Sequence, residues 1–245
     1  MSRLITTEGI VLHTTPYSEH SMVARIFTRQ LGIQSCMVRG VRSRNGHTKQ
    51  NQLQPLEHIE LTLYHNPRHD IHHVKEMRVK HPVTPDIVQT ALRFFKAEVL
   101  YKTLRPAEPQ PNLFDYVAEE SDSPCPIAHQ PLVFLLGLSR HLGIEPLDNY
   151  DEKSPLFSPE EGCFISERTM GLPTSTEEHR VLTFTAEESL LFHQYLQVFH
   201  RNAASPSLTT AQRENLFEQV LKYYDIHLEG FGRPKSVDIL HTILH

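Results

Sequence analysis

Residues 20–56 form a run of 37 residues without Asp or Glu, although the whole chain has 29 acidic residues against 24 Lys and Arg. Basic side chains that have no carboxylate beside them attract anions, and in a polar loop they typically contact phosphate. The run therefore predicts a phosphate-binding surface. The run contains the basic residues Arg25, Arg29, Arg39, Arg42, Arg44 and Lys49, of which Arg25 and Arg29 could equally lie on the outer face of a strand and are not selected as phosphate contacts.

The charge of the chain divides in the same way. Residues 1–80 carry 11 Lys and Arg against 6 Asp and Glu, a net charge of +5, whereas residues 81–245 carry 13 against 23, a net charge of −10. Such an asymmetry speaks to partners rather than to fold. It predicts that the N-terminal part binds a polyanion and that the remainder has another task.

The basic side chains have to be positioned by strands, because apolar and polar residues alternate in short segments up to about residue 80. Pro16, Gly32, Gly40, Asn45-Gly46 and Asn66-Pro67 give turn signals between these segments. Five strands with a long basic loop after the third predict an OB-fold, a barrel that binds oligonucleotides. The expected strands are 9–14, 22–28, 33–39, 59–64 and 71–79.

From residue 82 onward the apolar spacing becomes helical. A first helix is expected from Thr84, as N-cap with Pro85 at the first position, to about Leu104. The fold class is thus α+β: a five-stranded OB-fold barrel in residues 1–81, followed by an all-α C-terminal domain in residues 82–245. The further helices are expected at 113–120, 127–142, 186–201, which opens with a capping box at Thr185, and 211–228.

Catalytic signatures are missing from the sequence. It contains no Walker A loop, no Gly-x-Ser-x-Gly, no His-Glu-x-x-His and no Gly-x-Gly-x-x-Gly, so we expect no enzyme, no catalytic residue and no cofactor. Three distant cysteines, Cys36, Cys125 and Cys163, favour a reducing cytoplasm over a disulfide framework. No apolar run approaches the roughly 20 residues that span a bilayer, and no cleavable signal is expected.

The order and spacing of several short motifs resemble the RecO family of bacterial recombination mediators. The residues that carry the resemblance are Glu8–Leu12, Pro16–Glu19, Phe27-Thr28, Leu31-Gly32, Val38–Arg42, Leu53–Leu56 and, near the C-terminus, Phe231–Ser236. The resemblance implies a cytoplasmic, nucleoid-associated protein that binds single- and double-stranded DNA. It further implies annealing of complementary strands coated with single-strand-binding protein and, with RecR, assistance in loading the RecA recombinase. The alternative is an OB-fold RNA-binding protein or nucleic-acid enzyme that shares only the barrel.

Within this interpretation the DNA-binding candidates fall into three groups. Residues 1–80 contain only three aromatic residues, Tyr17, Phe27 and Tyr64, so DNA binding by charge is expected to outweigh base stacking. For each cation the alternative is an ordinary solvated surface charge, and for the third group it is a loop that leads into a helix. The groups are Arg39, Arg42, Arg44 and Lys49; Lys75, Arg78 and Lys80; and Arg233 and Lys235.

Metal and partner sites are less well marked. Some RecO proteins hold zinc with two Cys-x-x-Cys pairs, but here only Cys163 lies in that region, so no structural zinc is expected. His65, His69, His72 and His73 match no known zinc spacing and indicate an exposed histidine-rich hairpin.

The resemblance implies that the acidic, Phe-ended tail of single-strand-binding protein docks on the helical domain. Its basic rim is expected among Arg93, Lys96, Lys102, Arg105 and Arg140, for which solvated helix charge is the favoured alternative; the RecR contact cannot be located.

Overall fold

The computed structural model describes residues 3–41, 53–80, 86–105, 109–119, 125–166, 183–201 and 206–244. The chain forms two compact units. The barrel unit comprises Met1–Ser123 and Pro234–Leu244, and the helical unit comprises Pro124–Arg233. The strands end near residue 81, as expected, but three helices belong to the barrel unit, and a domain boundary at 81/82 stays a prediction.

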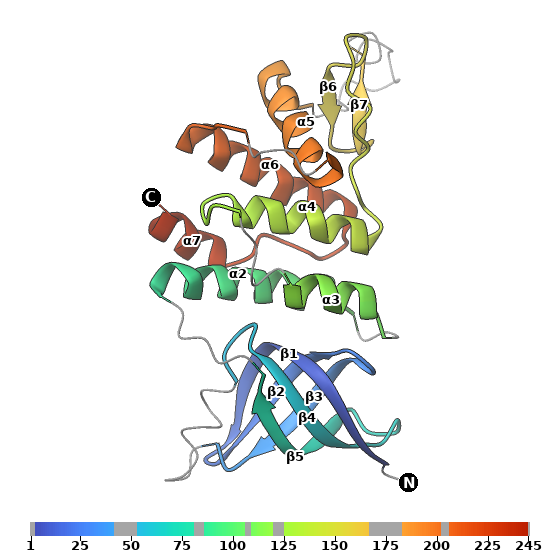
Figure 1. Ribbon diagram of the computed structural model, residues 1–245, viewed down its shortest axis with the longest axis vertical. Helices are drawn as coiled ribbons and strands as arrows, with labels where there is room; N and C mark the ends of the chain where they lie inside the picture. The colour runs from blue at the N-terminus through green and yellow to red at the C-terminus, as the bar shows by residue number, and fades with distance from the viewer. Residues whose placement is uncertain are drawn as a thin grey trace. The chain divides into compact units, whose positions relative to one another are not determined.

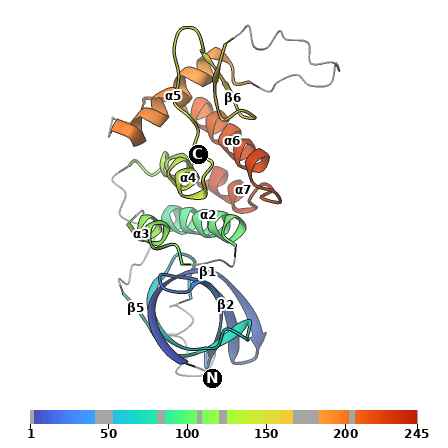
Figure 2. The ribbon, with the colours of Figure 1, turned by 90° about the vertical axis from the view of Figure 1, so that its right-hand side faces the viewer.

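Five strands close into a barrel (Figures 1 and 2). Around the barrel their order is β1-β2-β3-β5-β4, with β3 and β5 parallel and with β1 paired antiparallel to β4 to complete the ring. This Greek-key barrel confirms the predicted OB-fold and its α+β class. The strands are β1 (Arg3–Ser18), β2 (Ser21–Thr28), β3 (Gly32–Arg39), β4 (His58–His65) and β5 (Ile71–Val79).

Alternating side chains fill the barrel. Gly9 belongs to this interior, since a Cβ atom there would lie 2.6 Å from Ile26 Cγ2 and 2.9 Å from Leu61 Cδ2. Cys36 is also enclosed, and burial raises the pKa of its thiol to about 12, so it packs as an apolar group. The outward positions are therefore left to polar and charged side chains. The buried cluster includes Val11, Met22, Ala24, Ile26, Val38, Ile59, Leu61 and Leu63.

Three helices complete the barrel unit: α2 (Ile87–Thr103), α3 (Pro111–Glu119) and α7 (Ser236–Leu244). The predicted cap at Thr84 is wrong, because Asp86 is the N-cap of α2 and its carboxylate accepts the N–H of Gln89 at 2.8 Å. Asp competes well with Thr at this position. Helix α7, which packs along α2, was not predicted as a helix.

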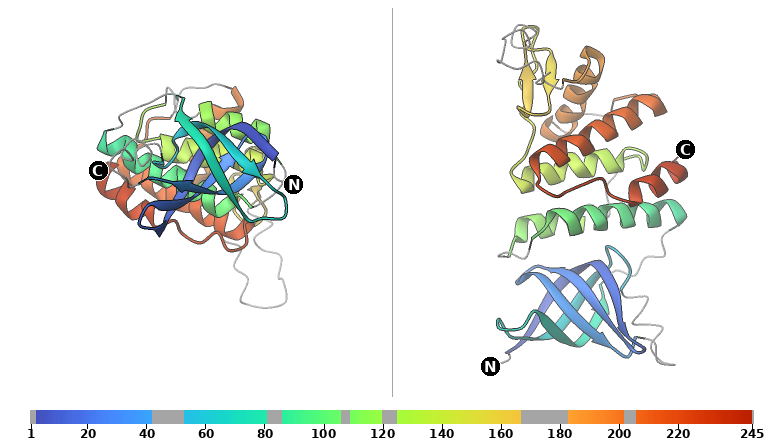
Figure 3. Two further views of the ribbon diagram at one scale, coloured as in Figure 1. Left: turned by 90° about the horizontal axis from the view of Figure 1, so that it is seen from below. Right: turned by 180° about the vertical axis from the view of Figure 1, so that it is seen from behind.

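The helical unit contains α4 (Gln130–Leu142), α5 (Ala186–Arg201) and α6 (Thr210–His227). Thr185 and Glu188 form the predicted capping box, with their reciprocal bonds at 3.2 and 2.7 Å. A two-stranded sheet, β6 (Leu156–Ser158) and β7 (Cys163–Ile165), was not predicted and packs against α5 (Figure 3). Within the described ranges, no helix combines the length and apolarity needed to cross a membrane.

Aromatic rings form the centre of the helical unit. Phe157 of β6 contacts the rings of Phe164, Phe184 and Phe192, with centroids 4.5 to 5.2 Å apart. Each of these rings is almost fully buried. Cys163 of β7 precedes Phe164 of this cluster, and the packed rings hold the β6–β7 hairpin in place.

Candidate nucleic-acid interface

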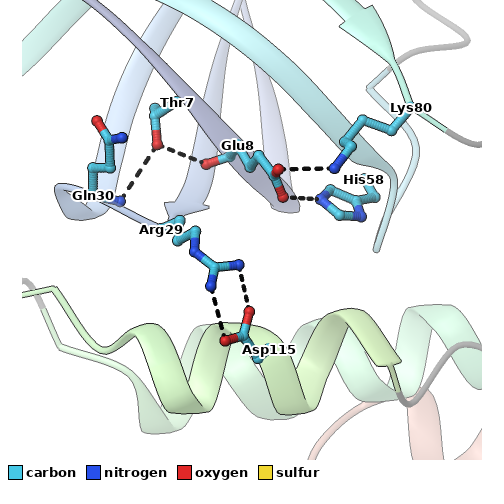
Figure 4. A network of polar contacts seen from close by, with 7 residues as sticks. All are labelled: Thr7, Glu8, Arg29, Gln30, His58, Lys80 and Asp115. Atoms are coloured by element: carbon cyan, nitrogen blue, oxygen red, sulfur yellow. Dashed lines mark hydrogen bonds and ion pairs between the residues drawn. The ribbon is translucent and has the colours of Figure 1, made fainter.

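Arg29, which directly follows β2, forms an ion pair within the barrel unit. Its guanidinium donates two hydrogen bonds to the Asp115 carboxylate of α3, at 2.5 and 2.9 Å, and lies 5.8 Å from the centre of the Phe114 ring (Figure 4). Phe114 in turn packs on Phe27 and His58. Arg29 therefore links the barrel to α3, and its charge is already compensated.

Glu8 of β1 compensates the charge of Lys80, one of the predicted DNA-binding cations. Its carboxylate accepts a hydrogen bond from Lys80 Nζ at 2.8 Å and contacts His58 Nε2 at 3.1 Å (Figure 4). The bond from Lys80, supported by His58, lowers the pKa of Glu8 despite partial burial. A phosphate at Lys80 would have to compete with this carboxylate.

The outer face of β5 carries the other two members of that group. Arg78 pairs with Glu60 at 2.9 Å, although three quarters of its side chain remains exposed. Lys75 lies at a β-bulge opposite Thr62 and Leu63, is exposed and, within the described part of the chain, forms no ion pair. Bulges redirect a side chain out of the regular alternation. Among the described residues, Lys75 is thus the one cation of the second predicted group without a carboxylate partner.

Arg39 ends β3 and is exposed. Its Cα partner is Ser21, and the two N–H groups that follow, those of Gly40 and Val41, donate to the carbonyl of His20 at 2.7 and 3.2 Å. Gly40 adopts a positive φ of 73°, which turns the chain away from the strand. The other members of the first predicted group, Arg42, Arg44 and Lys49, lie outside the described residues.

The C-terminal motif is held by carboxylates. Arg233 forms an ion pair with Glu218 at 2.7 Å, and the Gly232 N–H donates to Asp225 at 2.9 Å. In the barrel unit, the backbone N–H groups of Lys235 and Ser236 donate to Glu98 at 2.9 and 2.8 Å, which caps α7. These contacts match the loop that leads into a helix, the alternative considered for Arg233 and Lys235.

The cations proposed for a partner rim lie in different surroundings. Arg93 of α2 donates to the carbonyl of Pro55 and to the Glu57 carboxylate, both at 3.0 Å. Lys96 is buried and Lys102 half-buried in the same helix, whereas Arg105 is exposed just after its C-cap, Leu104. Arg140, in the helical unit, pairs with Glu145 at 3.1 Å. Arg93 holds the segment before β4 to α2.

The histidines occupy the β4–β5 hairpin. The His65 and His72 rings lie 4.7 Å apart, and the burial of His72, with a smaller contribution from His65 and His69, lowers its pKa. In the part of the chain that the structure describes, no three His, Cys, Asp or Glu side chains form a group that could hold a metal. The same hairpin carries an exposed Arg68, which was not among the predicted contacts.

The three barrel aromatics differ sharply in exposure. Phe27 is buried against Phe114, and Tyr64 lies directly opposite Leu4 across the β1–β4 pair. Tyr17 is 66% exposed at the end of β1. Only one barrel aromatic is thus both open and without a cross-strand apolar neighbour.

Comparisons with known proteins agree with the fold. The family model described as "Recombination protein O N terminal" matches residues 1–83. The chain is similar to proteins named DNA repair protein RecO from Porphyromonas gingivalis (30% identical, covering 98% of this chain and 99% of the relative), Phocaeicola vulgatus (30%, 97% and 98%) and Flavobacterium psychrophilum (26%, 98% and 98%). The resemblance drawn from the sequence motifs is confirmed, and this protein belongs to the RecO family of DNA repair proteins.

Proposed function

We propose that this protein is a non-catalytic recombination mediator that binds single- and double-stranded DNA and anneals complementary strands coated with single-strand-binding protein. With RecR it assists the loading of the RecA recombinase. Membership of the RecO family gives the role in recombinational repair. The observation that carries the DNA-binding step is an OB-fold barrel on which Arg39 and Lys75 are exposed at the surface.

Contact through charge suits an annealing factor. Arg39 ends β3 and Lys75 projects from a bulge in β5, so both present basic groups to a phosphate backbone rather than to base edges. Such contacts tolerate any sequence and weaken steeply with salt. Two strands held in this way can slide until their bases pair. Arg42, Arg44 and Lys49 remain part of the proposal on sequence grounds.

The acidic tail of single-strand-binding protein is proposed to contact the end of α2, where Lys102 and Arg105 reach the surface. A carboxylate-rich peptide is attracted to cations, which also favour this end of a helix. Arg93 is less suited to this role because it already holds Glu57 and Pro55.

Annealing of complementary oligonucleotides coated with the cognate single-strand-binding protein tests the proposal. We expect the wild type to accelerate pairing and the Arg39→Ala/Lys75→Ala double variant to bind DNA with a salt slope smaller by about two, one for each lost phosphate contact. Lys153→Ala removes an exposed cation of the helical unit and serves as the matched control. Absence of acceleration, with the double variant binding as tightly as wild type, would contradict the proposal, and a magnesium-dependent nuclease activity would favour an enzyme.

A further inference from the structure

Tyr17 is the most exposed aromatic side chain in the described part of the chain, with 66% of its surface accessible. It lies at an irregularity of the β1–β2 pairing, where Pro16 faces Met22 and Ser18 faces Ser21, so that Tyr17 has no Cα partner. A bulge of this kind re-aims one side chain away from the ladder. Tyr17 is therefore displaced from the alternation that packs the barrel.

Exposure alone would mean little, because single apolar side chains are common on protein surfaces. Of the other exposed aromatics of the barrel unit, Tyr64 faces Leu4 and Tyr101 lies 5.1 Å from the His13 ring, while Phe94 of α2 is less exposed than Tyr17, at 47%. Among the described residues, the Tyr17 ring has neither an aromatic or cationic neighbour nor a hydrogen bond.

The backbone on either side of Tyr17 is constrained. Pro16 fixes its own φ near −65°, and the Ser18–Ser21 pair closes the turn directly after Tyr17. A ring presented by a fixed backbone loses little conformational entropy when a flat ligand stacks on it. The arrangement is that of a preorganised stacking surface.

Arg39 lies at a strand end close to the one that carries Tyr17. Ser21, which faces Ser18, also faces Arg39 on its other side, so the end of β1 and the end of β3 are two strand spacings apart, about 10 Å. The His20 carbonyl holds the turn to Gly40 and Val41. Strand ends at this backbone separation can carry a ring and a guanidinium that contact a base and a nearby phosphate of one strand.

We propose that Tyr17 is a base-stacking platform for single-stranded DNA and that Arg39 holds a phosphate of the same strand. This inference rests on the proposed DNA-binding function and deepens it. Unpaired bases can stack on an aromatic ring whatever their sequence, whereas the bases of a duplex are already stacked on each other. Tyr17 thus gives the barrel a preference for single strands that its cations alone do not provide.

The test compares single-stranded and duplex oligonucleotides of equal length by fluorescence anisotropy at several salt concentrations. Tyr17→Ala is expected to weaken single-strand binding about 5- to 100-fold, to leave duplex binding unchanged and to keep the salt slope, because no phosphate contact is lost. Tyr17→Phe retains the ring and should bind as wild type. Tyr64→Ala is the matched control and should also bind as wild type. Urea denaturation verifies that each variant is folded.

Each outcome decides between the two proposals. If Tyr17→Ala binds single strands as tightly as wild type, or weakens both DNA forms equally, the stacking proposal fails and the DNA-binding function stands. The same holds if Tyr17→Phe behaves like Tyr17→Ala. Normal DNA affinity with lost annealing of protein-coated strands would identify Tyr17 as a protein contact instead. A wild-type protein that binds neither DNA form would overturn the proposed function and, with it, this inference.

Discussion

An arginine lies at each end of the β2–β3 pair, but the surroundings of the two arginines differ. At one end, Arg29 follows β2 and is held by two hydrogen bonds to Asp115. At the other end, Arg39 closes β3, and its side chain is exposed. One arginine fastens the barrel to a helix, and the other is presented at the surface.

The difference teaches that a run without acids in sequence need not be free of acids in space. Asp115 is 86 residues from Arg29 along the chain. Glu57 and Arg93 are 36 residues apart, and Glu8 and Lys80 are 72 apart. Whether a cation is available to DNA is therefore decided by carboxylates that the fold brings in from elsewhere.

The largest effect on stability is expected from substitution of Arg93, which, like Arg29, is held in an ion pair. Arg93→Ala leaves the buried Glu57 carboxylate without its guanidinium and the Pro55 carbonyl without its donor. Removing one partner of a buried ion pair costs about 2 to 4 kcal/mol of unfolding free energy, somewhat less than for full burial because Arg93 is partly exposed. Urea denaturation at pH 7 measures the loss.

The pH dependence of that loss gives an internal check. Burial raises the pKa of Glu57, and Arg93 opposes the rise. A raised carboxyl pKa means that Glu57 destabilises the fold increasingly as pH rises through it, and most strongly without Arg93. The deficit of Arg93→Ala should hence shrink as the pH is lowered toward 4.5. A deficit that is constant between pH 7 and pH 4.5 would show that the ion pair is not its cause.

The next effect contrasts the two arginines directly. Arg39→Ala should lower DNA affinity about three- to ten-fold at moderate salt and reduce the salt slope by about one, with unfolding free energy within about 0.5 kcal/mol of wild type. Arg29→Ala should do the reverse: DNA affinity is kept, and stability falls by about 0.5 to 1 kcal/mol, a small value because the pair is partly solvated. Equal losses of DNA affinity in both variants would abolish the distinction between the two ends.

The sequence predicted the barrel well because alternation, turn residues and apolar spacing are local signals. Its strands and the capping box at Thr185 follow from neighbouring residues. The β6 strand was not predicted because a strand of three residues is too short to show an alternating pattern. Helix α7 was not predicted because its N-terminal cap is the side chain of Glu98, which belongs to another helix. The sequence likewise could not show which cations pair with carboxylates that are distant along the chain.

The smallest effect tests whether a fastened cation can be released. Lys80 projects from the end of β5 and is held by Glu8, whose pKa it lowers. Glu8→Gln removes the negative charge and keeps a hydrogen-bond acceptor, so Lys80 becomes available to phosphate and DNA affinity should rise about two-fold at low salt, with a slightly steeper salt slope.

Stability provides the matching control for Glu8→Gln. A lowered carboxyl pKa stabilises the fold above the unfolded-state pKa and is lost as pH falls through the folded value, so the variant should be less stable than wild type at pH 7 and equally stable in acid. Glu60→Gln, which releases Arg78 on the same face, should raise DNA affinity in the same direction. If neither release strengthens DNA binding, this face of β5 lies outside the DNA path, and Arg39 with Tyr17 marks the path instead.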